Sequence, residues 1–283
     1  MGFLSEENSE IRCLERVANH IRQVVLDMVY NAKSGHIGGD FSEMELLIAL
    51  YFKFLRFSSS DTDAPDRDRF VLSKGHCVEP LYAILAEKGC FPERELAGYG
   101  STGSPFIGHP NRKIPGIEMN TGSLGHGLSL GCGMALAARM DHRPYHTYVL
   151  LGDGELNEGS VWEAAMFAAH NRLDKLMAIV DCNGLQISGP TEKVLSPGNL
   201  PIRWKAIGWH VVELADGNDM RAVCGVYEKA LAGSGKPTVI LAHTVKGAGC
   251  PSIEGKVEWH HRVPSQPEYE RMKAELEEGA LLL

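Results

Sequence analysis

From Thr147 onward the sequence alternates between short segments with a strand pattern and longer segments with a helix pattern. Segments rich in apolar and β-branched residues predict buried strands, and the segments between them predict helices. We predict strands at 147–151, 176–181, 209–214 and 237–243, and helices at 158–171, 198–207 and 218–232. Strands that alternate with helices form a mostly parallel sheet that is covered on both faces. The predicted fold class is therefore α/β, with three layers in the order α/β/α.

The residues before Thr147 predict a helical first half. Apolar residues recur at helical spacing over 8–32, and Ser42 is expected to cap a second helix that ends near Phe54. The other predicted elements are a strand at 69–73 and helices at 80–88, 93–98, 125–140 and about 267–278.

Residues 99–127 are rich in Gly, Pro, Ser and Asn and have no steady period. A loop of this length inside a compact domain is more often functional than a simple connection. The sequence shows no internal repeat and no linker that would mark a boundary. We therefore expect residues 1–283 to form a single domain.

Composition excludes several classes of function. The chain has 36 acidic and 28 basic residues, a formal net charge of -8 and no long Lys/Arg cluster, so nucleic acid is not an expected partner. No apolar segment is long enough to span a bilayer and no signal peptide is recognisable, so we expect a cytoplasmic protein that does not bind membranes. The seven cysteines are widely spaced without a C-x-x-C motif, which indicates neither a disulfide framework nor a zinc site.

A tight Gly-Asp-Gly turn follows the strand predicted at 147–151, and the next strand leads into Asn183. Asp153 and Asn183 are 30 positions apart, the length of one strand–helix–strand unit, so both are expected at the carboxyl edge of the sheet, where ligands bind. Carboxylate, amide and carbonyl oxygens suit Mg²⁺ or Ca²⁺, and phosphate oxygens of a ligand commonly complete such a site. The alternative is that both residues simply form turns.

The pattern G-D-G, about thirty residues and then Asn resembles the diphosphate-binding motif of thiamine-diphosphate enzymes, and the surrounding sequence resembles the N-terminal part of transketolases. Over roughly residues 10–265, the segments that carry the resemblance are SGHIGG (34–39), DRFVLSKGH (68–76), GHP (108–110), TGSLGHGLSLGCGMA (121–135), GDGELNEGSVWEA (152–164) and HTVKGAG (243–249). They come in the family's order. The resemblance implies the family's thiamine-diphosphate-binding fold, with thiamine diphosphate and Mg²⁺ or Ca²⁺ as cofactors.

The resemblance also implies the ligands of these cofactors. Asp153, the side chain of Asn183 and the backbone carbonyl of Leu185 would bind the metal, and Asn183 would also contact the cofactor. Gly154 would lie close to the diphosphate, where a side chain would obstruct it.

Four other residues match parts of the family's site. The loop around Gly122 and Leu124 would receive the aminopyrimidine side of the cofactor through backbone groups. Glu158 and Glu163 match acidic residues that link neighbouring active sites, Glu158 with a catalytic role and Glu163 near the cofactor.

Histidines in the matching loops suit chemistry on a sugar, because imidazole both donates and accepts protons near neutral pH. The resemblance implies that His76 contacts the diphosphate and that His36, His109 and His260 position the ketose and shuttle protons. His261 lies beside His260 and is its rival for that role. The alternative for each is a hydrogen-bonded loop residue without a catalytic role.

The chain departs from the family at three positions near the cofactor, where Ile37, Cys182 and His126 replace more usual residues. It also ends at Leu283, whereas a full transketolase continues into a pyrimidine-binding domain that supplies a glutamate to the cofactor. We therefore expect a separate C-terminal partner subunit with that domain, in an α₂β₂ heterotetramer, with active sites at the junction between the chains.

The predicted function is the N-terminal subunit of a two-chain transketolase, which transfers a two-carbon ketol unit from a ketose phosphate to an aldose acceptor. The alternatives are a subunit of a 2-oxo acid dehydrogenase or decarboxylase that also uses thiamine diphosphate, and a non-catalytic binding protein that retains the fold. A nicotinamide oxidoreductase is disfavoured, because GCGMALA lies inside a helical pattern with no strand before it.

Overall fold

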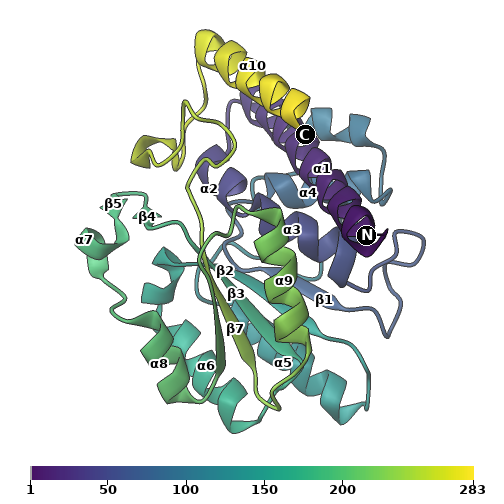
Figure 1. The fold of residues 1–283 in the computed structure, drawn as a ribbon, viewed down its shortest axis with the longest axis vertical. Coiled ribbons are helices and arrows are strands. Elements are labelled where there is room, and N and C mark those ends of the chain that lie inside the picture. Colours follow the sequence, from purple (N-terminus) through teal and green to yellow (C-terminus); the bar gives the residue numbers. More distant parts are fainter. Residues whose placement is uncertain (1) are drawn as a thin grey trace.

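A sheet of five parallel strands forms the centre of the molecule (Figure 1). The computed structural model describes the backbone of residues 2–283 and the side chains of residues 7–283. The strands, whose spatial order is β1-β2-β3-β7-β6, are β1 (Arg69–Leu72), β2 (Thr147–Gly152), β3 (Leu176–Cys182), β6 (His210–Leu214) and β7 (Thr238–His243). Every neighbouring pair in this sheet is parallel.

The helical elements surround this sheet. They are α1 (Gly2–Ala32), α2 (Ile37–Ser42), α3 (Met44–Ala49), the π-helix η1 (Leu50–Phe54), α4 (Glu79–Glu87), α5 (Gly127–Met140), α6 (Gly159–His170), α7 (Thr191–Leu195), α8 (Leu200–Ile207), α9 (Met220–Leu231), α10 (Gln266–Leu282) and the 3₁₀-helices η2 (Glu93–Gly98), η3 (Gly154–Asn157) and η4 (Val257–Trp259). No helix within residues 2–283 is long and apolar enough to cross a membrane.

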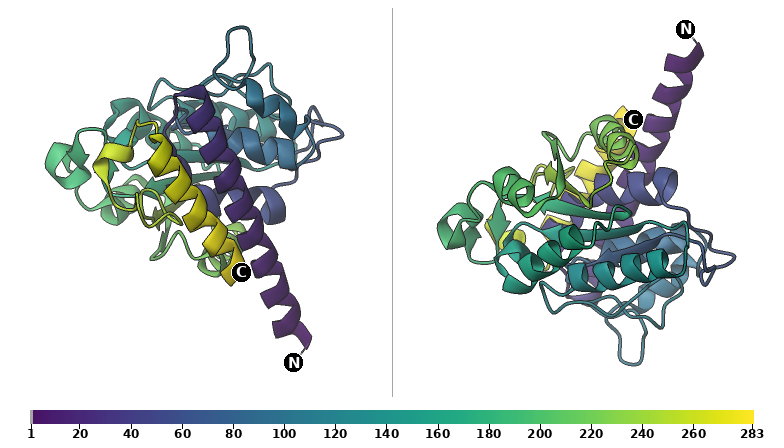
Figure 2. Two further views of the ribbon diagram at one scale, coloured as in Figure 1. Left: turned by 90° about the horizontal axis from the view of Figure 1, so that it is seen from above. Right: turned by 90° about the horizontal axis from the view of Figure 1, so that it is seen from below.

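Alternating strand residues build two cores, because successive side chains of a strand point to opposite faces. One face packs against α5, α6 and α8 through Val71, Val149, Leu151, Ala178, Val180, Val239 and Leu241. The other packs against α1, α3, α4 and α9 through Phe70, Leu72, Tyr148, Leu150, Met177, Ile179, Ile240 and Ala242. The sheet therefore lies between two helical layers, which confirms the predicted α/β/α class. Helix α10 lies along α1 outside these layers (Figure 2), where the rings of Tyr30 and Tyr269 stack with centroids 4.1 Å apart.

The prediction that Ser42 caps a helix was wrong. Ser42 ends α2 instead, and α3 begins two residues later at Met44. Its hydroxyl donates to Asp181 Oδ2 at 2.6 Å and lies 3.0 Å from the carbonyl of Gly39. A buried hydrogen bond to a residue 139 positions away has thus replaced the local cap that the sequence pattern favoured.

The segment after β3 contains elements that were not predicted. Two short antiparallel strands, β4 (Leu185–Gln186) and β5 (Gly189–Pro190), form a hairpin, and α7 follows it. Two-residue strands are too short to produce a sequence period, which explains why pattern analysis did not find them.

Residues 99–126 contain no helix or strand, as expected for this segment. Its end is fixed to the sheet, because the Thr121 hydroxyl donates to the Leu72 carbonyl at the end of β1 at 2.7 Å. This contact places Gly122 and Leu124 at the carboxyl edge of the sheet.

Two glycines of α5 give a matched test of the sheet–helix packing. A Cβ on Gly131 would lie 2.4 Å from Val149 Cγ2 in β2, whereas a Cβ on Gly133 would meet no atom within 4 Å. We expect Gly131→Ala to lower the free energy of unfolding by about 1–2 kcal/mol, because overpacking outweighs the gain in helix propensity. Gly133→Ala should raise it by about 0.5–1 kcal/mol. Urea unfolding of both variants measures the difference, and equal effects would contradict the close packing.

Candidate active site

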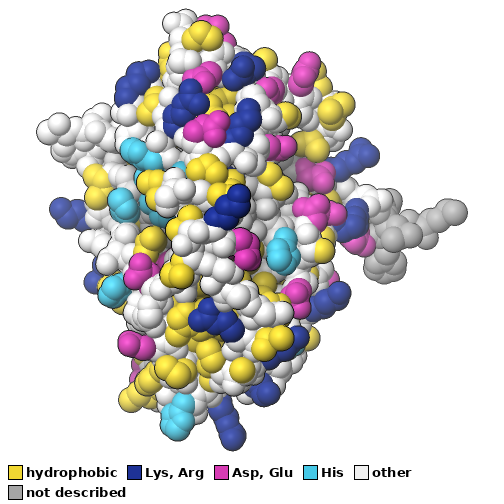
Figure 3. All heavy atoms as spheres, turned by 90° about the vertical axis from the view of Figure 1, so that its left-hand side faces the viewer, with side chains coloured by type: hydrophobic (Ala, Val, Ile, Leu, Met, Phe, Trp, Pro, Cys, Tyr) yellow, Lys and Arg dark blue, Asp and Glu magenta, His cyan; other side chains and the backbone are white. Residues whose placement is uncertain are grey.

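A cavity of about 450 Å³ opens at the carboxyl edge of the sheet, where the strand-following loops meet. It brings together most of the predicted site residues, namely His76, Gly122, Leu124, Asp153, Gly154, Glu158, Asn183, Leu185 and His260. Figure 3 views the molecule from the side on which α7 lies in Figure 1, and several histidines reach the surface there. Most of the loops predicted to form one site therefore contribute to the lining of one cavity.

Asp153 follows β2 and is 6% exposed. Its Oδ1 accepts from the amide of Gly154 at 2.8 Å, and its Oδ2 accepts from the amide of Gly184 at 2.9 Å and the hydroxyl of Thr191 at 3.2 Å. Burial and the nearby Asp181 raise the pKa of Asp153. Its hydrogen-bond partners are uncharged, so no protein cation pairs with this carboxylate among the described side chains.

Asn183 lies beside Asp153 after the neighbouring strand. Its amide nitrogen donates to Asp181 Oδ2 and to the hydroxyl of Ser42, both at 3.2 Å, and its Oδ1 accepts from the amide of Leu185 at 3.1 Å. The amide orientation is thus set by an acceptor on one side and a donor on the other. This arrangement leaves amide, carboxylate and carbonyl oxygens around the same cavity.

A buried ion pair underlies the cavity. Lys74 Nζ, in the loop after β1, lies 2.5 Å from Asp181 Oδ2 at the end of β3 and 3.0 Å from Glu43 Oε2. Burial alone would raise the pKa of Asp181, but Lys74 lowers it overall. Asp181 is therefore a stable carboxylate, and it also accepts from the hydroxyls of Ser42 and Thr244.

Lys246 is a second buried cation and lines the cavity. It is 2% exposed, and its nearest polar side-chain partner is His260 Nδ1 at 3.4 Å. No carboxylate of residues 7–283 lies within ion-pair distance of it, and burial lowers its pKa. A buried ammonium without a counter-ion attracts an anion to the cavity.

Three of the predicted histidines form a cluster. The ring centroid of His36 lies 4.9 Å from that of His76 and 5.8 Å from that of His260. Burial, with contributions from neighbouring cationic groups, lowers the pKa of His36 to about 3, that of His76 to about 2 and that of His260 to about 4. All three rings are therefore neutral at neutral pH, with one nitrogen able to donate and the other able to accept.

His109 reaches the site from the 99–126 segment. A Cβ on Gly122, whose φ is +132°, would lie 2.3 Å from His109 Cδ2, so only glycine permits this approach. The His109 carbonyl accepts from the Tyr82 hydroxyl at 2.6 Å. His109 thus packs beside the cavity, although it is not one of its lining residues.

Glu158 and Glu163 occupy different places. Glu158 lies on the exposed rim of the cavity, and Glu163 is exposed on α6 outside it. His260 lines the cavity, whereas the exposed His261 contacts the cluster from outside, with its ring centroid 4.5 Å from that of His36.

The sequence analysis missed Lys74, Asp181 and Lys246 as site residues, although two of them lie in matched segments. It also missed Glu155, which accepts from the amides of Gly125 at 2.8 Å and Gly152 at 3.1 Å and so joins the two glycine-rich loops. The sequence feature that could have identified Lys74 and Asp181 is a charged residue at the end of an apolar strand, as in FVLSK and AIVD.

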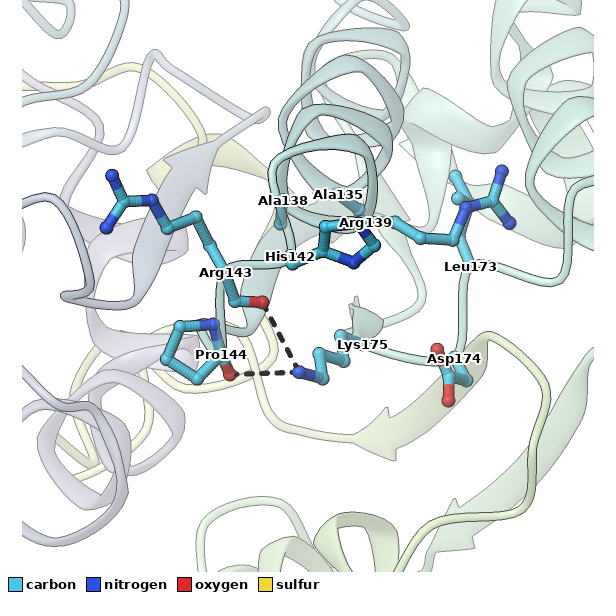
Figure 4. Close-up of a pocket in the computed structure, with 9 residues that line it drawn as sticks. All are labelled: Ala135, Ala138, Arg139, His142, Arg143, Pro144, Leu173, Asp174 and Lys175. Carbon is cyan, nitrogen blue, oxygen red and sulfur yellow. Dashed lines mark hydrogen bonds between the residues drawn. The ribbon is translucent and has the colours of Figure 1, made fainter.

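A second cavity, of about 360 Å³, lies at the opposite edge of the sheet between the end of α5 and the start of β3. Figure 4 shows that the guanidinium groups of Arg139 and Arg143 point away from one another. Arg143 pairs with Asp66 at 3.2 Å, and Lys175 donates to two backbone carbonyls. Because its cations diverge and are already engaged, this cavity is a poor anion site.

Comparisons with known proteins agree with the site. The family model described as "Transketolase, thiamine diphosphate binding domain" matches residues 13–277. The chain is 46% identical over 269 residues to one subunit of the apulose-4-phosphate transketolase of Phocaeicola vulgatus, with 95% of each chain covered. It is 43% identical over 269 residues to a 6-deoxy-6-sulfo-D-fructose transketolase subunit of a Clostridium species, with 94% of this chain and 98% of the relative covered.

A solved structure gives the same result. The transketolase of Leishmania mexicana superposes with a TM-score of 0.88 at 34% sequence identity, over 93% of this chain and 41% of that chain. The chain therefore belongs to the transketolase family and corresponds to the thiamine-diphosphate-binding domain of that family. Its match along nearly the whole length of subunit chains confirms the prediction of an N-terminal transketolase subunit of the two-chain type.

Lys246→Met tests the unpaired cation directly. No side chain of residues 7–283 is a counter-ion to this buried charge, so removing the charge should raise the free energy of unfolding of the ligand-free chain by about 1 kcal/mol or more. The same change should weaken binding of inorganic pyrophosphate or thiamine diphosphate at least about tenfold, because a charge-assisted contact is lost. Urea unfolding and calorimetry measure the two effects, with the exposed Lys229→Met as the control. A loss of stability together with unchanged anion binding would contradict this role of Lys246.

Proposed function

We propose that this chain is the diphosphate-binding half of a two-chain transketolase. A separate C-terminal subunit with the pyrimidine-binding domain would complete an α₂β₂ heterotetramer in the cytoplasm. The assembly would transfer a two-carbon ketol unit from a ketose phosphate to an aldose acceptor. The observation that carries the proposal is the cavity at the carboxyl edge. There a buried carboxylate and a buried ammonium line the same space, and neither has an ion-pair partner among side chains 7–283.

A divalent cation fits the residues at Asp153. This carboxylate is buried and has uncharged partners, so a bound cation would supply a positive charge that no described side chain places there. Asn183 Oδ1 and the Leu185 carbonyl would add neutral oxygen ligands of the kind that Mg²⁺ and Ca²⁺ accept. Asp181 would orient Asn183 by accepting from its amide nitrogen, which turns the amide oxygen away from Asp181.

Several residues would hold the diphosphate. Lys246 and His76 would contact its oxygens, since both line the cavity and neither has a carboxylate partner within ion-pair distance among the described side chains. Gly154 would allow close approach of the phosphates, and its amide already donates to Asp153. Gly122 and Leu124 would meet the aminopyrimidine side through their backbone groups.

The neutral histidines would bind the sugar. When bound, thiamine diphosphate supplies the electron-accepting chemistry that breaks and forms the carbon–carbon bond. His36, His109 and His260 would orient the ketose by donating to or accepting from its carbonyl and hydroxyl groups and would move protons at these oxygens. Glu158 and Glu163, which the isolated chain exposes, would act at the contact with neighbouring chains.

The names of the relatives point to the substrate class. One relative acts on apulose 4-phosphate and another on 6-deoxy-6-sulfo-D-fructose, so both act on a sugar that carries an anionic group. We therefore propose a ketose with a terminal phosphate or similar anion as the donor. The alternative of a 2-oxo acid enzyme is less consistent with the family match and with the four histidines at the site.

Calorimetric titration with thiamine diphosphate tests the proposal. We expect binding that requires Mg²⁺ or Ca²⁺, is lost on chelation and becomes stronger when the C-terminal subunit is present. Asp153→Asn keeps the size of the side chain but removes its charge, so it should weaken metal-dependent binding by at least about 10–100-fold. The exposed Asp174→Asn is the matched control and should bind like the wild type.

Two results would overturn the proposal. One is the absence of cofactor binding even with a partner that associates with the chain. The other is binding that is independent of metal and unchanged in Asp153→Asn. A ketose-phosphate assay of the assembled subunits then tests the reaction itself.

A further inference from the structure

Three carboxyl groups that the proposed chemistry does not use lie beneath the histidine-bearing loops. Asp40, Glu43 and Glu79 are all fully buried. Both carboxyl oxygens of Asp40, and Oε2 of Glu79, have no hydrogen-bond donor among the described residues. Buried polar atoms in folded proteins are normally paired, so these oxygens require an explanation.

Charge balance favours a proton on some of these groups. Among the described side chains Lys74 is the cation that faces this cluster, and its ammonium already pairs with Asp181 at 2.5 Å and lies 3.0 Å from Glu43. One lysine does not balance four buried carboxylates. In agreement, burial raises the pKa of Glu43 to about 8 and that of Glu79 to about 7, and burial together with Glu79 and Glu43 raises the pKa of Asp40 well above its usual range.

The carboxyl groups of Asp40 and Glu79 lie close enough to interact, and each affects the pKa of the other. Two ionised carboxylates would repel each other in this buried site and neither would have a donor, whereas a proton on one of them allows a hydrogen bond between the two. That proton supplies the donor that the unpartnered oxygens lack. A pair that holds a proton at neutral pH is consistent with the burial and the missing donors.

The pair joins two loops of the active site. Asp40 lies in α2, and its backbone amide donates a hydrogen bond to the carbonyl of His36 at 3.1 Å. Glu79 begins α4, three residues after His76, and a Cβ on Gly35 would lie 2.8 Å from its Oε1. Glu79 thus lies directly against the loop that carries His36.

Helix α4 also contacts the 99–126 segment, which carries His109. The hydroxyl of Tyr99 donates to Glu79 Oε1 at 2.6 Å, at the start of the 99–126 segment. The hydroxyl of Tyr82, also in α4, donates to the carbonyls of Ile107 at 3.0 Å and His109 at 2.6 Å. The loops of His36, His76 and His109 therefore meet on one short helix.

We propose that Asp40 and Glu79 share a proton at neutral pH and that this bridge positions the His36 and His76 loops relative to one another. The other titratable and charged groups that face the pair are Glu43 after α2, Lys74 and Cys77 after β1, Tyr82 in α4, and Tyr99. The positioning role rests on the proposed function, whereas the shared proton is a property of this chain alone.

The pH dependence of unfolding tests the shared proton. A carboxyl group whose pKa rises from about 4.3 in the unfolded chain to about 7 in the folded chain stabilises the fold below pH 4, and this stabilisation is lost as the pH rises toward 7. Glu79→Gln removes this contribution. We expect the unfolding constant of the wild type, relative to that of Glu79→Gln, to rise about tenfold per pH unit between about pH 5 and about pH 7.

The exposed Glu95→Gln is the matched control and should follow the wild type. A ratio for Glu79→Gln that does not change with pH would overturn the proposal. If Glu79→Gln does not fold, Asp40→Asn allows the same comparison, because its amide nitrogen replaces the proton as donor to Glu79.

Infrared spectroscopy gives an independent measurement. At about pH 6 exposed carboxyl groups are ionised, so the carbonyl band of a protonated carboxylic acid reports buried ones. We expect this band to be weaker in Asp40→Asn and in Glu79→Gln than in the wild type and in Glu95→Gln. Equal bands in all four proteins would contradict a proton on this pair.

Cofactor binding separates positioning from simple burial. At constant pH, Glu79→Gln keeps a donor for Asp40 and should bind thiamine diphosphate within about threefold of the wild type, whereas Glu79→Ala should bind at least about tenfold more weakly. Equal binding by all three would overturn the positioning role. If the wild type itself does not bind the cofactor, the proposed function fails, and the unfolding and infrared results still decide whether the proton is shared.

Discussion

At the carboxyl edge of the sheet, the ammonium of Lys74 and the carboxylate of Asp181 form a buried ion pair that joins the ends of β1 and β3. Asp181 also accepts hydrogen bonds from Ser42, Asn183 and Thr244, so four segments distant in sequence meet at one side chain. Removing one member of such a pair leaves a buried charge without a partner, at a cost of about 3–5 kcal/mol. The geometry around Asn183 depends on this contact.

Two buried charges of opposite sign line the cavity, and neither has an ion-pair partner among the described side chains. Asp153 is a buried carboxylate with uncharged partners, and Lys246 is a buried ammonium without a carboxylate at ion-pair distance among residues 7–283. A metal–diphosphate group presents a cation and an anion together, so it satisfies both residues at once. Thiamine diphosphate with a divalent metal is a ligand of this kind, and the family of the chain binds thiamine diphosphate.

The sequence predicted the parallel strands well because buried strands and amphipathic helices have distinct periods. It predicted that Asp153 and Asn183 lie together at the carboxyl edge, because neighbouring parallel strands end at one edge of the sheet. It did not predict that Ser42 ends a helix instead of capping one, nor the hairpin β4–β5, nor the buried pair of Asp40 and Glu79. These features depend on tertiary contacts over long separations, such as the 139 positions between Ser42 and Asp181, and such contacts leave no local period.

The most direct measurement of the central claim is a crystal structure of the chain with thiamine diphosphate and Mn²⁺, in which anomalous scattering locates the metal. We predict one metal peak at the carboxyl edge, within coordination distance of Asp153, Asn183 Oδ1 and the Leu185 carbonyl, and in contact with diphosphate oxygens. A metal found only at the exposed group of His20, Glu87 and Glu93, or a diphosphate bound away from Asp153, would contradict the account.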